Sequence, residues 1–294
     1  MAVRICLRAF KEKIFIMFSI IDGVEISKSI YSECEEKLKN LNKKLKLSVI
    51  QIGDDEASTI YANRKKKMCE KYGIDFEIYN FNIYSIETDI IDLINKLNND
   101  DKVTGIFVEM PIPNNFNIKK ISSSVKYTKD IDGISEISIA RLVRDLDCLL
   151  PCTPAGIIEI IKRNNIEIEG KHCVILNRSD VIGKPLLHLL LKENATVTIC
   201  NSKTKNIKDI TNMADILIVA VNKQNFIDKS YIKQNAIVID CGIHLNSDNK
   251  IIGDVNFDDV KNKCSYITKV PGGVGTVTTS MILKNIIKAS ELNG

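Results

Sequence analysis

Helical apolar stripes and short apolar runs alternate along the first 110 residues of the chain. The stripes predict helices over Gly23 to Leu41, Ala57 to Tyr72 and Ile90 to Leu97, and the runs predict strands over Leu47 to Ile52, Phe76 to Phe81 and Gly105 to Met110. Gly73 follows the second helix and is a residue type that commonly ends helices. Strands that alternate with helices predict a parallel sheet.

A second unit begins near Pro151. We expect helices over Gly156 to Arg163 and Gly183 to Lys192, and strands over Cys173 to Leu176, Thr196 to Cys200, Ile216 to Val221 and Ala236 to Cys241. This β-α-β-α-β order is typical of a Rossmann-like half. The fold we predict is therefore α/β with two domains. The first spans residues 17–150 together with a closing helix over residues 280–292, and the second spans residues 151–279.

Composition excludes several classes of protein. The chain has 294 residues, of which 45% are hydrophobic, and its formal net charge is only +4. That charge is small and evenly spread, so we expect no nucleic-acid partner. The longest apolar stretch, Ile14 to Ile21, is less than half of a membrane span, so we also expect no membrane association.

Cysteine and histidine usage indicates a reducing compartment and no metal site. The nine cysteines are scattered, odd in number and never spaced as CxxC, and the three histidines are isolated. We therefore expect a cytoplasmic protein. Residues 1–16 leave an alternative, because four basic residues there face a single acid, as in the transit peptides of mitochondria or plastids. An untargeted extension, or a true start at Met17, would explain them equally well.

The helix predicted over residues 57–72 has a lysine on its apolar face. With about 100° of rotation per residue, Tyr61, Lys65, Met68 and Tyr72 share one face of the helix. Desolvation lowers the pKa of a lysine, so an inward Lys65 could transfer protons. Alternatively, Lys65 lies at the edge of the stripe and extends its ammonium group to water.

Two acidic positions could face that lysine. Glu109 follows a buried strand, and ligands of open α/β sheets bind beyond the carboxyl ends of the strands. Asp132 lies in the segment Lys129 to Gly133 (KDIDG). The alternatives are an ordinary loop carboxylate for Glu109 and a turn-forming role for Asp132, since Asp-Gly is a common turn pair.

The turn from Asn177 to Gly183 lies between a predicted strand and a predicted helix, where dinucleotides bind, although it lacks the full glycine pattern. The next strand ends in Ser202 and Lys203 instead of the acid that holds the ribose of NAD. Together with Arg178, this neutral-to-basic end suits a 2′-phosphate. A Rossmann-like domain without cofactor is the alternative. The run from Pro271 to Gly275 permits close approach of backbone to a ligand, but such runs are often simple turns.

Taken together, these segments resemble the bifunctional methylenetetrahydrofolate dehydrogenase/cyclohydrolases over nearly the whole chain. The landmarks occur in order, and they are IIDG (20–23), Y-x-x-x-K (61–65), FVEMPIP (107–113), KDIDG (129–133), PCTPAG (151–156), RSDVIGKP (178–185), IDCGI (239–243), GDV (253–255) and PGGVG (271–275).

The resemblance implies oxidation of 5,10-methylenetetrahydrofolate with NADP and hydrolysis of the methenyl product to 10-formyltetrahydrofolate. It implies an active site in the cleft between the domains and, commonly in this family, a homodimer. The catalytic residues implied are Lys65, Tyr61, Glu109 and Asp132. The folate pocket implied adds Ser58, Val108, Met110, Pro271, Gly272, Gly273, Val274 and Gly275. The NADP site implied consists of Asn177, Arg178, Ser179, Gly183, Ser202, Lys203 and Ile243.

The chain departs from the family pattern at four positions. Glu109 replaces a glutamine, Asn177 and Asn222 replace glycines, and Thr276 replaces a proline. A carboxylate beside a lysine favours the ammonium form, so Glu109 is expected to slow hydrolysis more than oxidation. The two asparagines could crowd the cofactor. Two alternatives follow, namely a dehydrogenase with weakened cyclohydrolase activity and a non-catalytic homologue that binds folate or a nucleotide.

Overall fold

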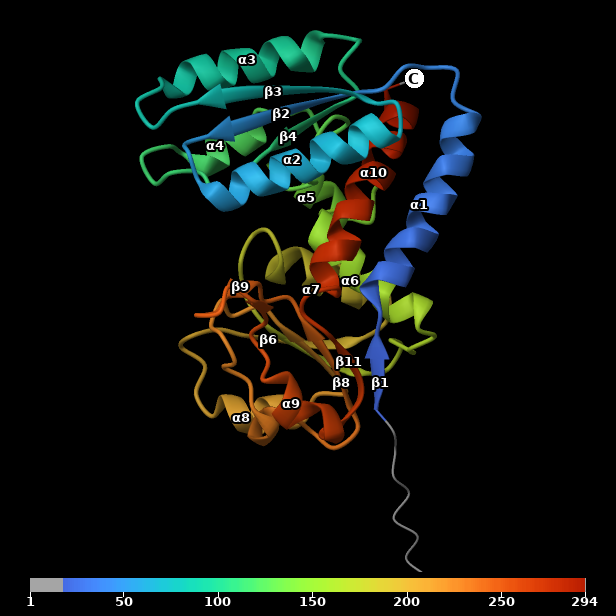
Figure 1. Ribbon diagram of the computed structural model, residues 1–294, viewed down its shortest axis with the longest axis vertical. Helices are drawn as coiled ribbons and strands as arrows, with labels where there is room; N and C mark the ends of the chain where they lie inside the picture. Colours follow the sequence, from blue (N-terminus) through green and yellow to red (C-terminus); the bar gives the residue numbers. More distant parts are fainter. Residues whose placement is uncertain (1–17, 294) are drawn as a thin grey trace, which may run out of the picture.

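The computed structural model describes residues 18–293, apart from the side chains of residues 56 and 57. The predicted N-terminal extension, residues 1–16, lies outside the described residues. Two α/β units stand one above the other in Figure 1, and long helices run between them. This arrangement confirms the predicted two-domain α/β fold.

The first unit is built on a three-stranded parallel sheet in the order β3-β2-β4. Its strands are β2 (Lys46–Ile52), β3 (Asp75–Phe81) and β4 (Gly105–Val108), and its helices are α2 (Glu56–Lys71), α3 (Glu87–Asn99) and α4 (Ile118–Ser123). Helices α3 and α2 cover opposite faces of the sheet (Figure 1). β2 is buried along six of its seven residues, as expected for the central strand of a covered parallel sheet.

The second unit is built on a six-stranded parallel sheet in the order β1-β11-β8-β7-β5-β6. Its strands are β1 (Ser19–Ile21), β5 (His172–Leu176), β6 (Thr196–Cys200), β7 (Ile216–Val219), β8 (Ala236–Asp240) and β11 (Cys264–Thr268). The helices α7 (Gly183–Lys192), α8 (Ile207–Thr211) and α9 (Phe257–Val260), the single turns η1 (Lys229–Tyr231) and η2 (Lys261–Lys263), and the hairpin β9 (His244–Leu245) with β10 (Ile251–Ile252) complete this unit. The order β6-β5-β7 is that of a Rossmann half.

Three long helices join the two units. They are α1 (Gly23–Lys39), α6 (Cys152–Arg163) and α10 (Val274–Leu292), and the short helix α5 (Glu136–Val143) precedes them in the link from the first unit. The amide of Asn285 on α10 donates to the carbonyls of Ile131 and Leu150, each at 2.8 Å. One buried apolar cluster includes residues of both sheets and of all three long helices. This shared core fixes the position of one unit relative to the other.

Two parts of the sequence prediction need correction. The closing helix begins at Val274 and not at residue 280, so the end of the glycine-rich run is already helical. β-branched Val and Thr residues concealed that first turn, because they lower helix propensity, whereas packing against α1 and α6 stabilises it. In addition, β1 pairs with β11 of the second sheet although it precedes the first unit. The proposed domain boundaries stay a prediction.

Candidate functional site

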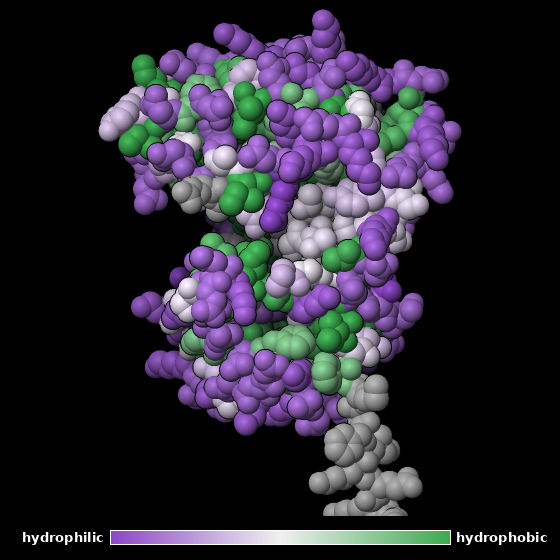
Figure 2. All heavy atoms as spheres, in the orientation of Figure 1, coloured by the Kyte–Doolittle hydropathy of each residue, from purple (hydrophilic) through white to green (hydrophobic). Residues whose placement is uncertain are grey.

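The molecule is hollowed between its two units (Figure 2). An inner cavity of about 270 Å³ and an outer cavity of about 410 Å³ open into this cleft. They share six lining residues, which are Tyr61, Cys241, Ile243, Val274, Gly275 and Thr279. The two cavities are therefore parts of one continuous cleft.

Lys65 and Glu109 form a buried ion pair in the inner cavity. The Nζ atom of Lys65 lies 2.7 Å from Oε1 and 3.0 Å from Oε2 of Glu109, and both residues are at most 4% exposed. Burial raises the pKa of the Glu109 carboxyl, and the positive charge of Lys65 opposes that rise. The ammonium group also lies 4.1 Å from the centre of the Phe107 ring. The structure thus places Lys65 inward, as its position on the apolar stripe predicted.

Asp132 completes a cluster of ionisable groups in the same cavity. Burial, assisted by the negative charge of Asp130, raises the pKa of Asp132 to about 7. Asp130 itself accepts hydrogen bonds from the backbone of Gly133 and Ser135 and from the hydroxyl of Ser138. Asp130 therefore folds the turn, whereas Asp132 faces the cavity and is free to meet a ligand.

Local structure explains why α2 presents Lys65 to this site. The helix begins after Asp55, whose carboxylate accepts a hydrogen bond from the backbone of Ser58 at 2.8 Å. The Ser58 hydroxyl donates to Met110, directly after β4, at 3.1 Å. The start of α2 is thereby fixed to the strand end that bears Glu109.

Two residues predicted for the folate pocket face elsewhere. Ser58 is 3% exposed, its hydroxyl bonds to Asp55 and Met110, and it lines neither cavity. Val108 packs in a separate apolar cluster under α3. Alternate residues of a strand point to opposite faces, so Phe107 and Glu109 face the cleft and Val108 cannot.

The glycine-rich run from Pro271 to Gly275 forms one wall of the outer cavity. Gly272 has a φ of +96°, and its carbonyl accepts a hydrogen bond from the backbone of Gly23 at 2.9 Å. A Cβ at Gly273 would lie 2.4 Å from the carbonyl oxygen of Lys269. These positions need glycine for the chain to turn from β11 into α10.

A third cavity, of about 480 Å³, lies beyond the carboxyl ends of β5, β6 and β7. Asn177, Arg178, Ser179 and Ser202 line it, together with Lys223 and Phe226. Gly183 and Lys203 do not line this cavity, and Ile243 lies instead in the central cleft. The loop geometry is that of a dinucleotide site, with a basic residue where a 2′-phosphate would be held.

Asn177 organises the loop that follows β5. Its side-chain oxygen accepts hydrogen bonds from the backbone of Ser179 at 2.7 Å and of Gly183 at 3.0 Å, and its amide donates to Ala220 at 2.7 Å. The side chain is thus turned into the loop. Asn222 adopts a left-handed φ of +54°, which asparagine tolerates better than most residues in place of glycine.

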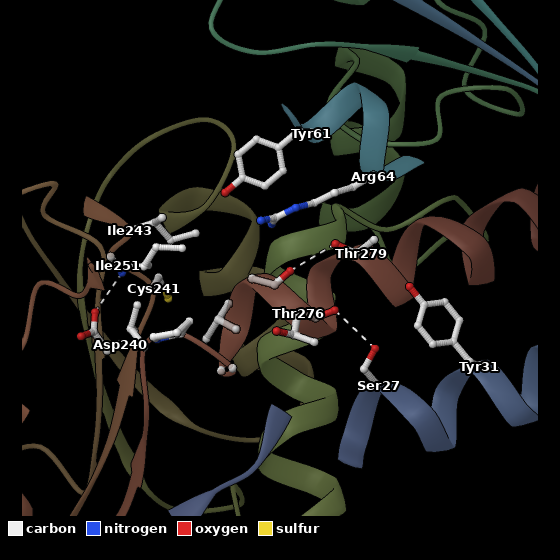
Figure 3. Close-up of a pocket in the computed structure, with 17 residues that line it drawn as sticks. Ser27, Tyr31, Tyr61, Arg64, Asp240, Cys241, Ile243, Ile251, Thr276 and Thr279 are labelled. Atoms are coloured by element: carbon white, nitrogen blue, oxygen red, sulfur yellow. Dashed lines mark hydrogen bonds between the residues drawn. The ribbon is translucent and has the colours of Figure 1, made fainter. Parts of the chain in front are cut away.

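Several residues of the cleft were missed by the sequence analysis. The inner cavity also contains Cys152, Thr153 and Thr278, and the outer cavity contains Arg64 and Tyr31. Arg64 precedes Lys65 in a basic stretch, so its position in the sequence did not distinguish it from the solvent-facing lysines. Tyr61 and Arg64 point from α2 toward Thr276 and Thr279 on α10 (Figure 3).

The structure also bears on metal binding and on membranes. Within residues 18–293 no group of three or more His, Cys, Asp and Glu side chains is placed to hold a metal ion. The eight cysteines of this range are all free thiols. None of the described helices is long and apolar enough to cross a bilayer.

Two family models match the chain. Residues 21–132 match the catalytic domain of tetrahydrofolate dehydrogenase/cyclohydrolase, and residues 151–293 match the NAD(P)-binding domain of the same enzymes. A relative from Agathobacter rectalis, named bifunctional protein FolD, is 48% identical over 278 residues, which cover 94% of this chain and 100% of the relative.

Solved structures agree with these matches. A bifunctional methylenetetrahydrofolate dehydrogenase/cyclohydrolase from Campylobacter jejuni superimposes with a TM-score of 0.90 at 39% identity, covering 94% of this chain and 99% of that one. A Trypanosoma brucei methylenetetrahydrofolate dehydrogenase-cyclohydrolase, complexed with NADP and an inhibitor, superimposes with a TM-score of 0.88 at 30% identity, covering 94% of this chain and 98% of that one.

Proposed function

The chain belongs to the tetrahydrofolate dehydrogenase/cyclohydrolase family, and from that premise we propose that the cleft around Lys65 performs both reactions of the family. The first is NADP-dependent oxidation of 5,10-methylenetetrahydrofolate to the methenyl form, and the second is hydrolysis of that product to 10-formyltetrahydrofolate. The observation on which this proposal chiefly rests is the buried Lys65 in a cleft that also contains Asp132 and Tyr61.

Lys65 is the proton-transferring group of the proposed hydrolysis. Water adds to the methenyl carbon, one of its protons must be accepted, and a proton must be supplied to the nitrogen that leaves this carbon. An amine held 2.7 Å from a carboxylate has a partner with which to exchange that proton. The same carboxylate favours the ammonium form, and only the neutral amine can accept a proton. We therefore infer that Glu109 restrains hydrolysis more than oxidation.

Asp132 and Tyr61 position the substrate. An ionised Asp132 accepts hydrogen bonds from the N–H groups of the pterin, and burial of its carboxyl makes those bonds strong. The ring of Tyr61 borders both cavities and provides an aromatic surface for the aminobenzoyl ring. Met110 and the glycine-rich wall from Pro271 to Gly275 enclose the remainder.

The residues present beyond β5 and β6 fit NADP. The guanidinium of Arg178 makes no ion pair with any described residue, and Ser202 offers a hydroxyl where an acid would repel a 2′-phosphate. When bound, NADP accepts the hydride from the methylene carbon. Ile243 lies in the central cleft, where it can hold a nicotinamide ring near that carbon.

A paired assay tests the proposal. Purified protein is given methylenetetrahydrofolate with NADP in one cuvette and methenyltetrahydrofolate in the other. Turnover in both cuvettes, above the uncatalysed rate of hydrolysis, is the expected result. Absence of turnover in both, with folate still bound, would leave a binding protein in place of an enzyme.

We further infer that two copies associate through β3. This strand is the edge of its sheet, and Ile78 on it is 36% exposed. The loop that follows exposes Ile83, Tyr84 and Ile86. An uncovered edge strand beside apolar side chains is a surface that proteins usually cover. Light scattering that gives twice the mass of 33.0 kDa would support this inference, and a monomer would contradict it.

The free thiols support the expected reducing compartment. All eight cysteines between residues 18 and 293 are unpaired and seven of them are buried, as is common in proteins of the cytoplasm. An organelle reached through residues 1–16 is the alternative, and microscopy of a tagged full-length chain in its native host would distinguish the two.

A further inference from the structure

The outer cavity is a second compartment of the cleft, and its chemistry differs from that of the inner one. The inner cavity contains Lys65, Glu109 and Asp132, which act on the pterin end of the substrate in the function proposed above. The outer cavity leads from Tyr61 toward α1, where Ser27 and Tyr31 form its far side (Figure 3). A substrate that begins at Asp132 and passes Tyr61 must extend into this outer space.

Arg64 is the sole cationic residue among the described residues that line the outer cavity. Its guanidinium makes no hydrogen bond or ion pair within residues 18–293, and its recorded contact is with the face of the Tyr61 ring, at 5.4 Å. In Figure 3 the side chain extends into the cavity between Tyr61 and Thr279. An arginine held over an aromatic ring is partly ordered before a ligand arrives, so less entropy is lost on binding.

No carboxylate of the outer cavity neutralises this arginine. The one acid that lines it is Asp240, which is 4% exposed. Its oxygens accept hydrogen bonds from the backbone of Gly242 at 2.8 Å, Asp254 at 3.1 Å and Val255 at 3.0 Å. Asp240 thus folds its own loop, and the guanidinium remains available to an anion supplied by the ligand.

We propose that Arg64 binds a carboxylate of the glutamyl tail of the folate substrate and so selects glutamylated folates. This inference rests on the proposed function. The tail begins on the far side of the aminobenzoyl ring from the pterin, and each glutamate adds carboxylate groups that a guanidinium can bind through two parallel hydrogen bonds. Because Arg64 adjoins the ring-binding Tyr61 on one helix, the first carboxylates beyond the ring lie within its reach.

The test compares two substrates that differ only in the tail. Methylenetetrahydrofolate has one glutamate, and methylenetetrahydropteroate has none. The dehydrogenase kinetics of both are measured for the wild-type chain, Arg64→Ala and Lys67→Ala. Lys67 is a matched control, because it is an exposed cation on the same helix that lines neither cavity.

Arg64→Ala is expected to raise the KM for the glutamylated substrate about three- to tenfold more than the KM for the pteroate, as for a partly exposed ion pair. Lys67→Ala is expected to raise both by the same small factor. An equal change in both KM values for Arg64→Ala would overturn the role of Arg64. Absence of turnover by the wild-type chain with either substrate would overturn the proposed function, and this inference with it.

Discussion

The ammonium group of Lys65 lies within hydrogen-bond distance of both carboxylate oxygens of Glu109, at 2.7 and 3.0 Å. The lysine comes from α2 and the glutamate from the end of β4, so two elements of the first unit place one buried proton-transferring pair in the cleft. A charge removed from either side of such a pair alters the proton affinity of the other.

Glu109→Gln is expected to increase hydrolysis relative to oxidation. The amide keeps a hydrogen bond to Lys65 but removes the negative charge that favours the ammonium form. The ratio of cyclohydrolase to dehydrogenase kcat should rise about three- to tenfold, the range typical of modest changes in acid–base catalysis. Both rates are measured at pH 7.5, with the exposed Glu70→Gln on α2 as the control. An unchanged ratio would refute the inference that Glu109 restrains hydrolysis.

Asp132→Asn is expected to stabilise the fold at high pH while it weakens catalysis. The pKa of Asp132 is about 7 in the folded chain, against about 3.9 for an unperturbed aspartate. Between these values the folded state binds more protons than the unfolded state, so the free energy of unfolding falls as pH rises and then levels off above pH 7. The variant lacks this loss, and its free energy of unfolding at pH 8 should exceed that of the wild type by about 1–3 kcal/mol.

Urea unfolding at pH 5 and pH 8 measures this difference, which should be larger at pH 8. The kcat/KM of the wild type should rise through about pH 7 as Asp132 ionises, and that of the variant should stay low throughout. A variant that is less stable than the wild type at pH 8 would show that the carboxylate is well satisfied by its surroundings.

Arg178→Ala is expected to reduce the preference for NADP over NAD. The KM for NADP should increase about tenfold or more, because a charge-assisted pair with the 2′-phosphate is lost, whereas the KM for NAD should change little. Initial rates with each cofactor, beside a control at the distant Lys192, measure the effect. Equal increases for both cofactors would indicate that Arg178 supports the loop and does not contact the phosphate.

Strong periodicity allowed most of the fold to be predicted from the sequence. The helices with an apolar stripe and the short buried strands lie within a few residues of their predicted bounds, because burial of one face dictates both patterns. The short helices α4, α5 and α8 were not predicted, since five to eight residues contain too few turns to show a period. β1 was missed for the same reason, and only its pairing with β11 defines it.

The site could be predicted in part. The inward Lys65 followed from helix geometry, but Val108 was assigned to the pocket although the alternation along β4 turns it into the core. Asn177 was expected to crowd the cofactor, and its hydrogen bonds within the loop could not be derived from one residue in sequence. Arg64 depends on the approach of α10 to α2, which no local pattern specifies.

Lys65→Met, assayed for both reactions beside Lys67→Met, tests most directly whether Lys65 transfers protons in this cleft. Methionine retains the bulk of the side chain and removes the amine. The hydrolysis rate should fall at least about a hundredfold, as for loss of a general acid–base group, while methenyltetrahydrofolate still binds. Lys67→Met should retain both activities. Hydrolysis by Lys65→Met at the wild-type rate would contradict the central role assigned to Lys65.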